Sequence, residues 1–290
     1  MTLNNLKILL PTDLSARSIK AFKPAAYLAE LFGGKITIMT RYEQEEKSSF
    51  PTPPPPRKSN EAIKKELLEI AGKHINEELI DKAVVHTGTP AYKAICEESK
   101  KHDMVVMATH GRTGFSRLFL GSVVEKVLRF SFAPVLAVEE EGIRPLKNIL
   151  VTTDFSENSA EAFPYANEIA KASGAQIDLL NIAVKDQFSK DKDMETQRNM
   201  RKEMLTELID KHFSGIKDQI RAEMIAAETS IHEAITRRVN EGDYHLVIMS
   251  TLGRTSLDYL RLGSTASHVA RQVKTAVLSI NPRRHEEIPE

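Results

Sequence analysis

The feature that most constrains the fold is an internal repeat, because the chain carries the same succession of segments twice. The stretch Lys7–Ser15 returns as Asn148–Ser156, which places their two aspartates 141 positions apart. The stretch Met104–Thr113 returns as Leu246–Thr255, and a Leu-Gly-Ser follows each, both at an interval of 142 positions. Three blocks in the same order at nearly constant spacing indicate a duplication.

The duplication predicts the domain organisation. A chain of 290 residues is long for a single core, and two domains of similar size are the natural division. We predict a first domain at 1–141, a second at 147–282 and a tail at 283–290. Inside the first domain, 43–60 is polar and contains Pro53–Pro56. This composition predicts a solvated loop of partly polyproline II character, which serves as a stiff connector or as a ligand for a partner.

The period of the apolar residues predicts the fold class. Short apolar runs alternate with amphipathic stretches, which is typical of βαβ units with a buried parallel sheet. Strands are expected at 6–11, 35–40, 82–86, 103–109 and 134–138, and at 148–153, 175–182, 220–226, 244–250 and 275–280. Helices of the first copy are expected at 15–32, 60–80, 90–101 and 122–131. We therefore predict an α/β protein with two tandem Rossmann-like domains, each a five-stranded parallel sheet with helices on both faces.

Composition excludes several classes of function. Lys plus Arg and Asp plus Glu both number 40, so no bulk charge draws the chain to nucleic acid or to an anionic membrane. The first ten residues lack the apolar core of a signal peptide, and no uncharged apolar run reaches 18 residues. We expect a cytoplasmic protein. The single cysteine, Cys96, lies in a helical pattern and is expected to be a packing residue.

The repeated blocks fall where an open α/β sheet places its ligands, at the carboxyl ends of the first and fourth strands. Gly111 follows the fourth strand, and Gly121 and Ser122 open the next helix. Glycines allow a close approach of the main chain, and a helix N-terminus offers free N–H groups to a phosphate. The alternative is structural: Gly111 turns the chain, and Ser122 caps the helix with Glu125 completing a capping box.

The spacing between these glycines is similar to that of a known family signature. Nine residues separate the two glycines in each copy, Gly111 from Gly121 and Gly253 from Gly263. This pattern resembles the ATP-binding signature of the universal stress protein family, in which a Gly, two residues, a Gly and nine residues precede Gly-Ser or Gly-Thr. The resemblance extends over almost the whole chain, twice. It implies tandem domains of the adenine nucleotide alpha hydrolase-like kind.

One position departs from the signature in both copies. Ala108 and Ser250 stand where the family has its first glycine. Both side chains are small, so the close approach of the backbone is expected to survive with a less tight site. The resemblance implies nucleotide-binding roles for Pro11, Thr12, Asp13, Arg41, Ala108, Gly111, Arg112, Gly121, Ser122 and Val123, and for Thr153, Asp154, Ile182, Ser250, Gly253, Arg254, Gly263, Ser264 and Thr265.

Three kinds of side chain in this set have stated roles and alternatives. Asp13 and Asp154 match the acidic residue placed against the adenosine, although capping the next helix is an equally good use. At the end of the second strand, where the backbone holds adenine in relatives, Arg41 would cover the pocket or point to solvent. The arginines that follow the second glycines would face phosphates or lie on the surface.

Catalysis is not predicted. The chain has no P-loop, no G-x-G-x-x-G, no Ser-Gly-Gly-x-Asp-Ser, no G-x-S-x-G and no H-E-x-x-H. We expect no catalytic residues and no protein metal site. The resemblance implies a stress-response sensor or regulator that binds ATP or another adenine nucleotide, either alone or together with Mg²⁺. The alternatives are a nucleotide-free interaction scaffold and, with no positive support, a slow nucleotide hydrolase.

The resemblance also implies how the two copies are joined. Their last strands, Val135–Val138 and Val277–Ile280, are expected to pair within the chain, which would hide two sheet edges. A homodimer of the whole chain is an additional expectation.

Overall fold

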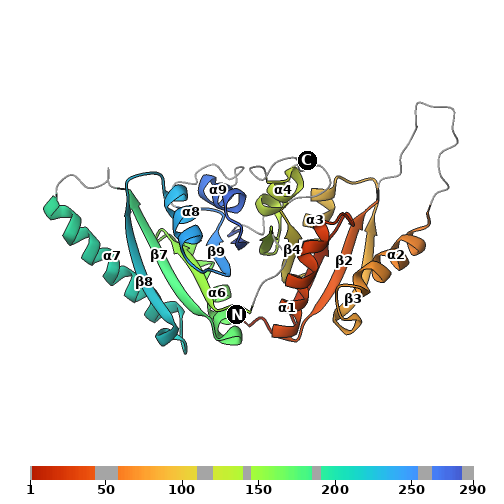
Figure 1. The fold of residues 1–290 in the computed structure, drawn as a ribbon, viewed down its shortest axis with the longest axis horizontal. Coiled ribbons are helices and arrows are strands. Elements are labelled where there is room, and N and C mark those ends of the chain that lie inside the picture. Colours follow the sequence, from red (N-terminus) through yellow and green to blue (C-terminus); the bar gives the residue numbers. More distant parts are fainter. Residues whose placement is uncertain are drawn as a thin grey trace, which may run out of the picture.

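A computed structural model describes residues 2–42, 58–109, 120–139, 145–184, 191–253 and 263–282. Ten strands form one sheet in the order β3-β2-β1-β4-β5-β10-β9-β6-β7-β8. Strands run parallel within each half of the sheet, and helices cover both faces (Figure 1). The predicted fold class is confirmed: two tandem Rossmann-like units, each with five parallel strands. The proline-rich segment lies outside the described residues over 43–57.

The elements of the two copies follow the same order. The first copy contains β1 (Lys7–Pro11), α1 (Phe22–Phe32), β2 (Lys35–Arg41), α2 (Asn60–Gly72), β3 (Ile80–His86), α3 (Ala91–Ser99), β4 (Met104–Ala108), α4 (Ser122–Phe130) and β5 (Val135–Val138). The second contains β6 (Asn148–Thr153), α5 (Glu157–Ala160), α6 (Phe163–Ser173), β7 (Gln176–Val184), α7 (Asp191–His212), β8 (Ile220–Ala227), α8 (Ile231–Glu241), β9 (Leu246–Ser250), α9 (Ser264–Gln272) and β10 (Ala276–Ile280). All ten expected strands are present within about two residues of the predicted ends.

Two predicted helices of the first copy are wrong in extent. The helix expected at 15–32 divides into a 3₁₀ turn at Ser18–Ala21 and α1. The helix expected at 60–80 begins at Asn60 but ends at Gly72. After it, the side chain of Asn76 accepts a hydrogen bond from the N–H of Glu78 at 3.1 Å and starts a separate 3₁₀ turn. Asn76 thus starts a new turn in a stretch where apolar periodicity alone would continue the helix.

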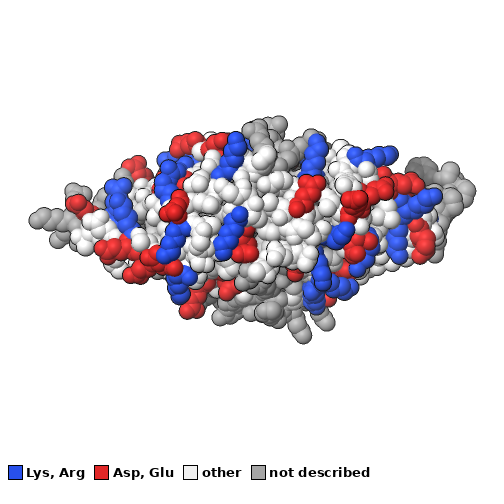
Figure 2. Space-filling view, turned by 90° about the horizontal axis from the view of Figure 1, so that it is seen from below, with Lys and Arg blue, Asp and Glu red and all other residues white. Residues whose placement is uncertain are grey.

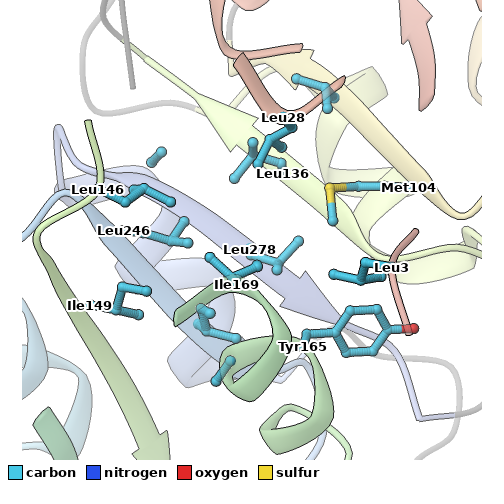
Figure 3. Close-up of a cluster of buried hydrophobic side chains, with 14 of the residues drawn as sticks. Leu3, Leu28, Met104, Leu136, Leu146, Ile149, Tyr165, Ile169, Leu246 and Leu278 are labelled. Carbon is cyan, nitrogen blue, oxygen red and sulfur yellow. The ribbon is translucent and has the colours of Figure 1, made fainter. Parts of the chain in front are cut away.

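The core is continuous across the two copies on one face of the sheet. Side chains of α1 and β5 meet those of α6 and β10 in a single buried cluster, which contains Leu136 and Leu278 (Figure 3). On the opposite face, one cluster lies beneath α3 and α4 and also includes Ala270 of α9, and a second lies beneath α8 and α9. The two halves therefore share part of one core.

Strands β5 and β10 join the halves. They pair antiparallel, with Val277 opposite Ala137, Leu278 opposite Leu136 and Ser279 opposite Val135. The joint carries polar ties as well, because Arg271 Nη2 donates to Glu125 Oε2 at 3.0 Å between α9 and α4. The inner edge strand of each half, β5 or β10, is thus paired with the other within the chain.

The surface and the buried thiol agree with the composition. Figure 2 shows Lys and Arg side chains interspersed with Asp and Glu on the face seen from below. Among the described residues, no helix has the length and apolar character needed to cross a membrane. Cys96 is fully buried in the cluster beneath α3 and α4, and burial raises the pKa of its thiol to about 12, as expected of a packing residue.

Candidate functional site

A cavity of about 260 Å³ lies at the carboxyl end of the second copy's sheet. Its walls come from the carboxyl halves of β6, β7 and β9 and from the first residues of α8 and α9. The predicted residues that line it are Thr153, Asp154, Ile182, Ser250, Gly253, Gly263, Ser264 and Thr265. Residues far apart in the sequence are thus brought to one cavity.

The loop after β6 fixes the orientation of Asp154. Phe155 has a left-handed backbone with φ 65°, which is uncommon for a residue other than glycine. Its N–H donates to Thr153 Oγ1, and the N–H of Ser156 donates to Asp154 Oδ1, both at 3.0 Å. The first copy repeats this turn, with φ 59° at Leu14. The same tight turn therefore presents both predicted aspartates.

The helix-capping alternative for these aspartates is wrong in the second copy. The cap residue of α5 is Ser156, whose side chain accepts from the N–H of Ser159 at 3.1 Å. Asp154 lies two residues earlier and uses Oδ1 to order the turn. Its other carboxylate oxygen, Oδ2, is directed toward Gly253, where an added Cβ would lie only 2.7 Å from it.

The two glycines of the second copy differ in how tightly they are constrained. At Gly253 an added side chain would only have to displace the end of the flexible Asp154 side chain. At Gly263 an added Cβ would lie 2.3 Å from the carbonyl oxygen of Thr251, which accepts from the Gly263 N–H at 3.0 Å. In the first copy Gly121 donates in the same way to Thr109 at 3.0 Å. The chain needs glycine here because the strand end and the helix start touch.

The helix starts are capped by glycine, so the capping box expected from Ser122 and Glu125 is wrong. Gly121 is the cap residue of α4 and Ser122 its first helical residue, and no side chain caps the helix. Glu125 contacts Arg271 of the other copy instead. Gly263 begins α9 in the same way. Without a side-chain cap, the first N–H groups of these helices remain suited to an anion.

The residue that replaces the first signature glycine has a local role. Ser250 Oγ donates to the carbonyl oxygen of Leu252 at 2.9 Å and accepts from its N–H at 3.2 Å. The hydroxyl therefore holds the loop that leads from β9 to Gly253. A small polar side chain takes the place of the glycine without filling the cavity.

The first copy presents its predicted residues at the same edge of its sheet. Pro11, Thr12 and Asp13 lie at the end of β1, Ala108 at the end of β4, and Gly121, Ser122 and Val123 at the start of α4. Arg41 ends β2, and its Nε donates to the carbonyl oxygen of Thr89 at 2.8 Å. This bond ties Arg41 to the loop before α3, and its two predicted roles stay predictions. Gly111, Arg112 and Arg254 lie outside the described residues.

Sequence reasoning missed several residues of the second cavity. Asn181 and Arg201 line it, as do Ile231, Ile235 and Met249. Arg201 Nη1 donates to Asn181 Oδ1 at 2.9 Å. Asn181 is a polar residue in a mostly apolar strand and offered a signal, but no local pattern placed Arg201 of α7 beside it.

Comparisons with known proteins identify the class. The model of the universal stress protein family matches residues 4–139 and again 145–281. A universal stress protein of Methanocaldococcus jannaschii is 31% identical over 145 residues, which cover 46% of this chain and 82% of the relative. A second from the same organism is 33% identical over 82 residues, or 28% of this chain and 46% of that relative. The chain belongs to the universal stress protein family and carries its domain twice.

Solved structures show the same tandem architecture. A universal stress protein from Archaeoglobus fulgidus DSM 4304 superposes with a TM-score of 0.69 at 23% identity, covering 95% of this chain and 98% of that one. A protein of Pseudomonas aeruginosa PAO1 superposes with a TM-score of 0.66 at 18% identity, covering 95% and 92%. At these identities the likeness concerns the fold.

A pair of histidines lies beside the second cavity. His232 is the second residue of α8 and His268 the fifth of α9, and their rings stack with centroids 4.2 Å apart. At the same helical positions the first copy has Tyr92 and Lys126, with the ammonium 4.5 Å from the ring centroid. The contact between α8 and α9 is thus a stacked histidine pair, whereas the equivalent contact between α3 and α4 is a cation–π pair.

This contact predicts a pH effect on stability. Burial, and then the neighbouring His268, lower the pKa of His232, so the folded state favours its neutral form. The stabilisation is present above the unfolded value of about 6.5 and is lost as the pH falls through the folded value. We expect the double variant His232→Tyr/His268→Lys to lose less stability between pH 7 and pH 5 than the wild type in urea unfolding. An equal loss in both proteins would contradict this role, since half-buried His102, whose pKa is also lowered by burial, remains as a common background.

Proposed function

We propose that the chain binds ATP or a related adenine nucleotide as a cytoplasmic stress-response sensor or regulator. One observation carries the proposal. Asp154 Oδ2 lies against Gly253, while the backbone at Gly263 opens α9 into the same cavity. A carboxylate for hydroxyl or amino groups and a glycine-lined helix N-terminus for phosphates are what one nucleotide requires.

The proposed ligand spans the cavity from β9 to β7. Its phosphates lie at Gly253, Gly263 and the first N–H groups of α9, where the helix end is partly positive. Its ribose hydroxyls bind Asp154, and its base enters between apolar side chains that include Ile182 and Ile235. The described residues hold no group of three or more His, Cys, Asp or Glu placed to bind a metal. We therefore assign any Mg²⁺ to the phosphates, which commonly carry it with several waters.

Pairing of the two repeats completes the proposed unit. We assign the domains to 1–141 and 147–282, and the β5–β10 ladder would serve as an intramolecular form of a two-subunit contact. Further homodimers of the chain would use other surfaces. The scaffold alternative is favoured by Ala108 and Ser250 in place of the first signature glycine and by Arg41, which is held by Thr89 beside the expected base position.

The first test is retention and binding of nucleotide by the full chain. We expect purified protein to release an adenine nucleotide on denaturation, or to bind ATP in calorimetry at ligand concentrations up to the millimolar range. A denatured sample of an unrelated protein from the same host serves as the control for carry-over. Absence of both retention and binding would exclude the proposal, and phosphate release above a no-protein blank would revive the hydrolase alternative.

A further inference from the structure

The two copies have an equivalent helix whose residues can be matched by packing. His74, just after α2, packs edge-on against the first residue of α1 with ring centroids 5.8 Å apart. His212, at the end of α7, packs in the same way against the first residue of α6 at 5.3 Å. Seven positions before each histidine is a leucine with no exposed surface, Leu67 and Leu205. Helices α2 and α7 are therefore aligned residue by residue.

This alignment exposes a difference in chemistry. Eleven positions before the two histidines stand Ile63 in the first copy and Arg201 in the second. Ile63 is buried, whereas Arg201 lines the cavity of the second copy. A buried apolar residue in one copy is thus matched by a cationic residue in the cavity wall of the other. Since the guanidinium is charged at all relevant pH values, this difference is permanent.

The cationic wall is held in place by a buried amide. Asn181 is 1% exposed, and its Nδ2 donates to the carbonyl oxygen of Thr153 at 2.8 Å. In the first copy Thr40 Oγ1 makes the corresponding bond to Thr12, also at 2.8 Å. The amide also carries a separate acceptor, Oδ1, which accepts from Arg201 at 2.9 Å. Asn181 thus links Arg201 to the strand end that presents Asp154.

Arg201 lies at the end of the cavity where the base of a bound nucleotide is expected. In the sheet, β6 lies between β9, which leads to the glycines, and β7, which carries Asn181. A nucleotide with phosphates at the glycines places its base toward β7 and α7. Arg201 is also 6.0 Å from the ring centroid of Phe155, beside the Asp154 turn. The guanidinium is therefore a donor group at the base end of the cavity, opposite the phosphates.

We propose that Arg201 makes the second copy select purines with a 6-oxo group, of the guanine or hypoxanthine type, over adenine. A guanidinium has several N–H donors and no acceptor. It matches the O6 and N7 acceptors of a 6-oxopurine in a two-bond contact, whereas the N6 amino group of adenine is itself a donor. This inference rests on the proposed nucleotide site and refines its specificity: the second copy still accepts an adenine nucleotide, but more weakly than a 6-oxopurine nucleotide.

The test compares three nucleotides on the full chain. Calorimetry is carried out with ATP, GTP and ITP on the wild type and on Gly121→Asp, in which binding at the first copy is expected to be blocked. ITP carries O6 and N7 without the 2-amino group, so it isolates the contact in question. We expect GTP and ITP to bind the second copy on the order of tenfold more tightly than ATP.

Two variants assign the preference to Arg201. Arg201→Ile, which installs the first copy's residue, should remove the preference, and Arg201→Lys should retain the charge but little of the preference. Arg198→Ile removes an exposed arginine one turn earlier on the same helix and should leave all affinities unchanged.

The outcomes separate the two proposals. If ATP binds the second copy as well as GTP and ITP do, or if Arg201→Ile leaves the ratio unchanged, the inference about Arg201 is overturned and the nucleotide site stands. If none of the three nucleotides binds either copy, the site itself is wrong.

Discussion

Gly263→Asp should weaken nucleotide binding by the second copy at least about a hundredfold, a loss of about 3 kcal/mol. Two effects act together at this position. An added Cβ would lie 2.3 Å from the Thr251 carbonyl oxygen, so the strand end and the helix start must separate. The new carboxylate would also stand at the start of α9, where a phosphate is proposed, and would take the N–H groups as its own cap. Calorimetric titration measures the loss as one missing site.

Matched variants separate the two effects of this substitution. Gly263→Ala adds the Cβ without the charge and should show a smaller loss, which reports the steric part alone. Gly121→Asp makes the equivalent change in the first copy and should remove that site while leaving the second intact. Urea unfolding of each variant checks that the chain still folds. Unchanged total stoichiometry in both aspartate variants would rule out the proposed location.

The fold could be predicted from the sequence because its determinants are local and repeated. Strands buried on both faces are continuous apolar runs, and a run such as Asn148–Thr153 has the same limits in the sequence and in the structure. Helix ends are less predictable, since they depend on individual side chains. Helix α2 ends at Gly72, and the Asn76 amide oxygen then accepts a bond in a separate turn that apolar periodicity does not detect.

The candidate site could likewise be predicted only in those parts that depend on local sequence. Asp154, Gly253 and Gly263 were predicted because the order of the chain fixes their spacing, and the structure places all three at one cavity. Arg201 was missed because its contact joins α7 to Asn181 of β7, 20 positions earlier in the chain and outside the repeated motifs. Glu125 was misassigned for a related reason, because its partner Arg271 belongs to the other copy. Contacts that depend on packing between elements leave no local pattern to read.

Leu278→Asp should destabilise the whole chain by several kcal/mol, because it places a carboxylate in the core that the two copies share. Leu278 and its register partner Leu136 are each 1% exposed, and both belong to the cluster that spans the halves (Figure 3). Truncating a buried leucine to alanine alone costs about 2 to 5 kcal/mol. A carboxylate adds the cost of burying an unpaired charge. Urea unfolding monitored by circular dichroism measures the change.

The same substitution should also alter the state of association. Opening the β5–β10 ladder exposes two apolar strand edges, which are templates for pairing with another chain. We expect Leu278→Asp to elute as larger species in size-exclusion chromatography with light scattering. Ser279→Ala is the matched control, since Ser279 is the next residue of β10, and its buried hydroxyl has no hydrogen-bond partner among the described residues. Removing that hydroxyl should leave stability unchanged or raise it. A Leu278→Asp protein as stable and as uniform in size as Ser279→Ala would show that the two copies do not depend on their shared core.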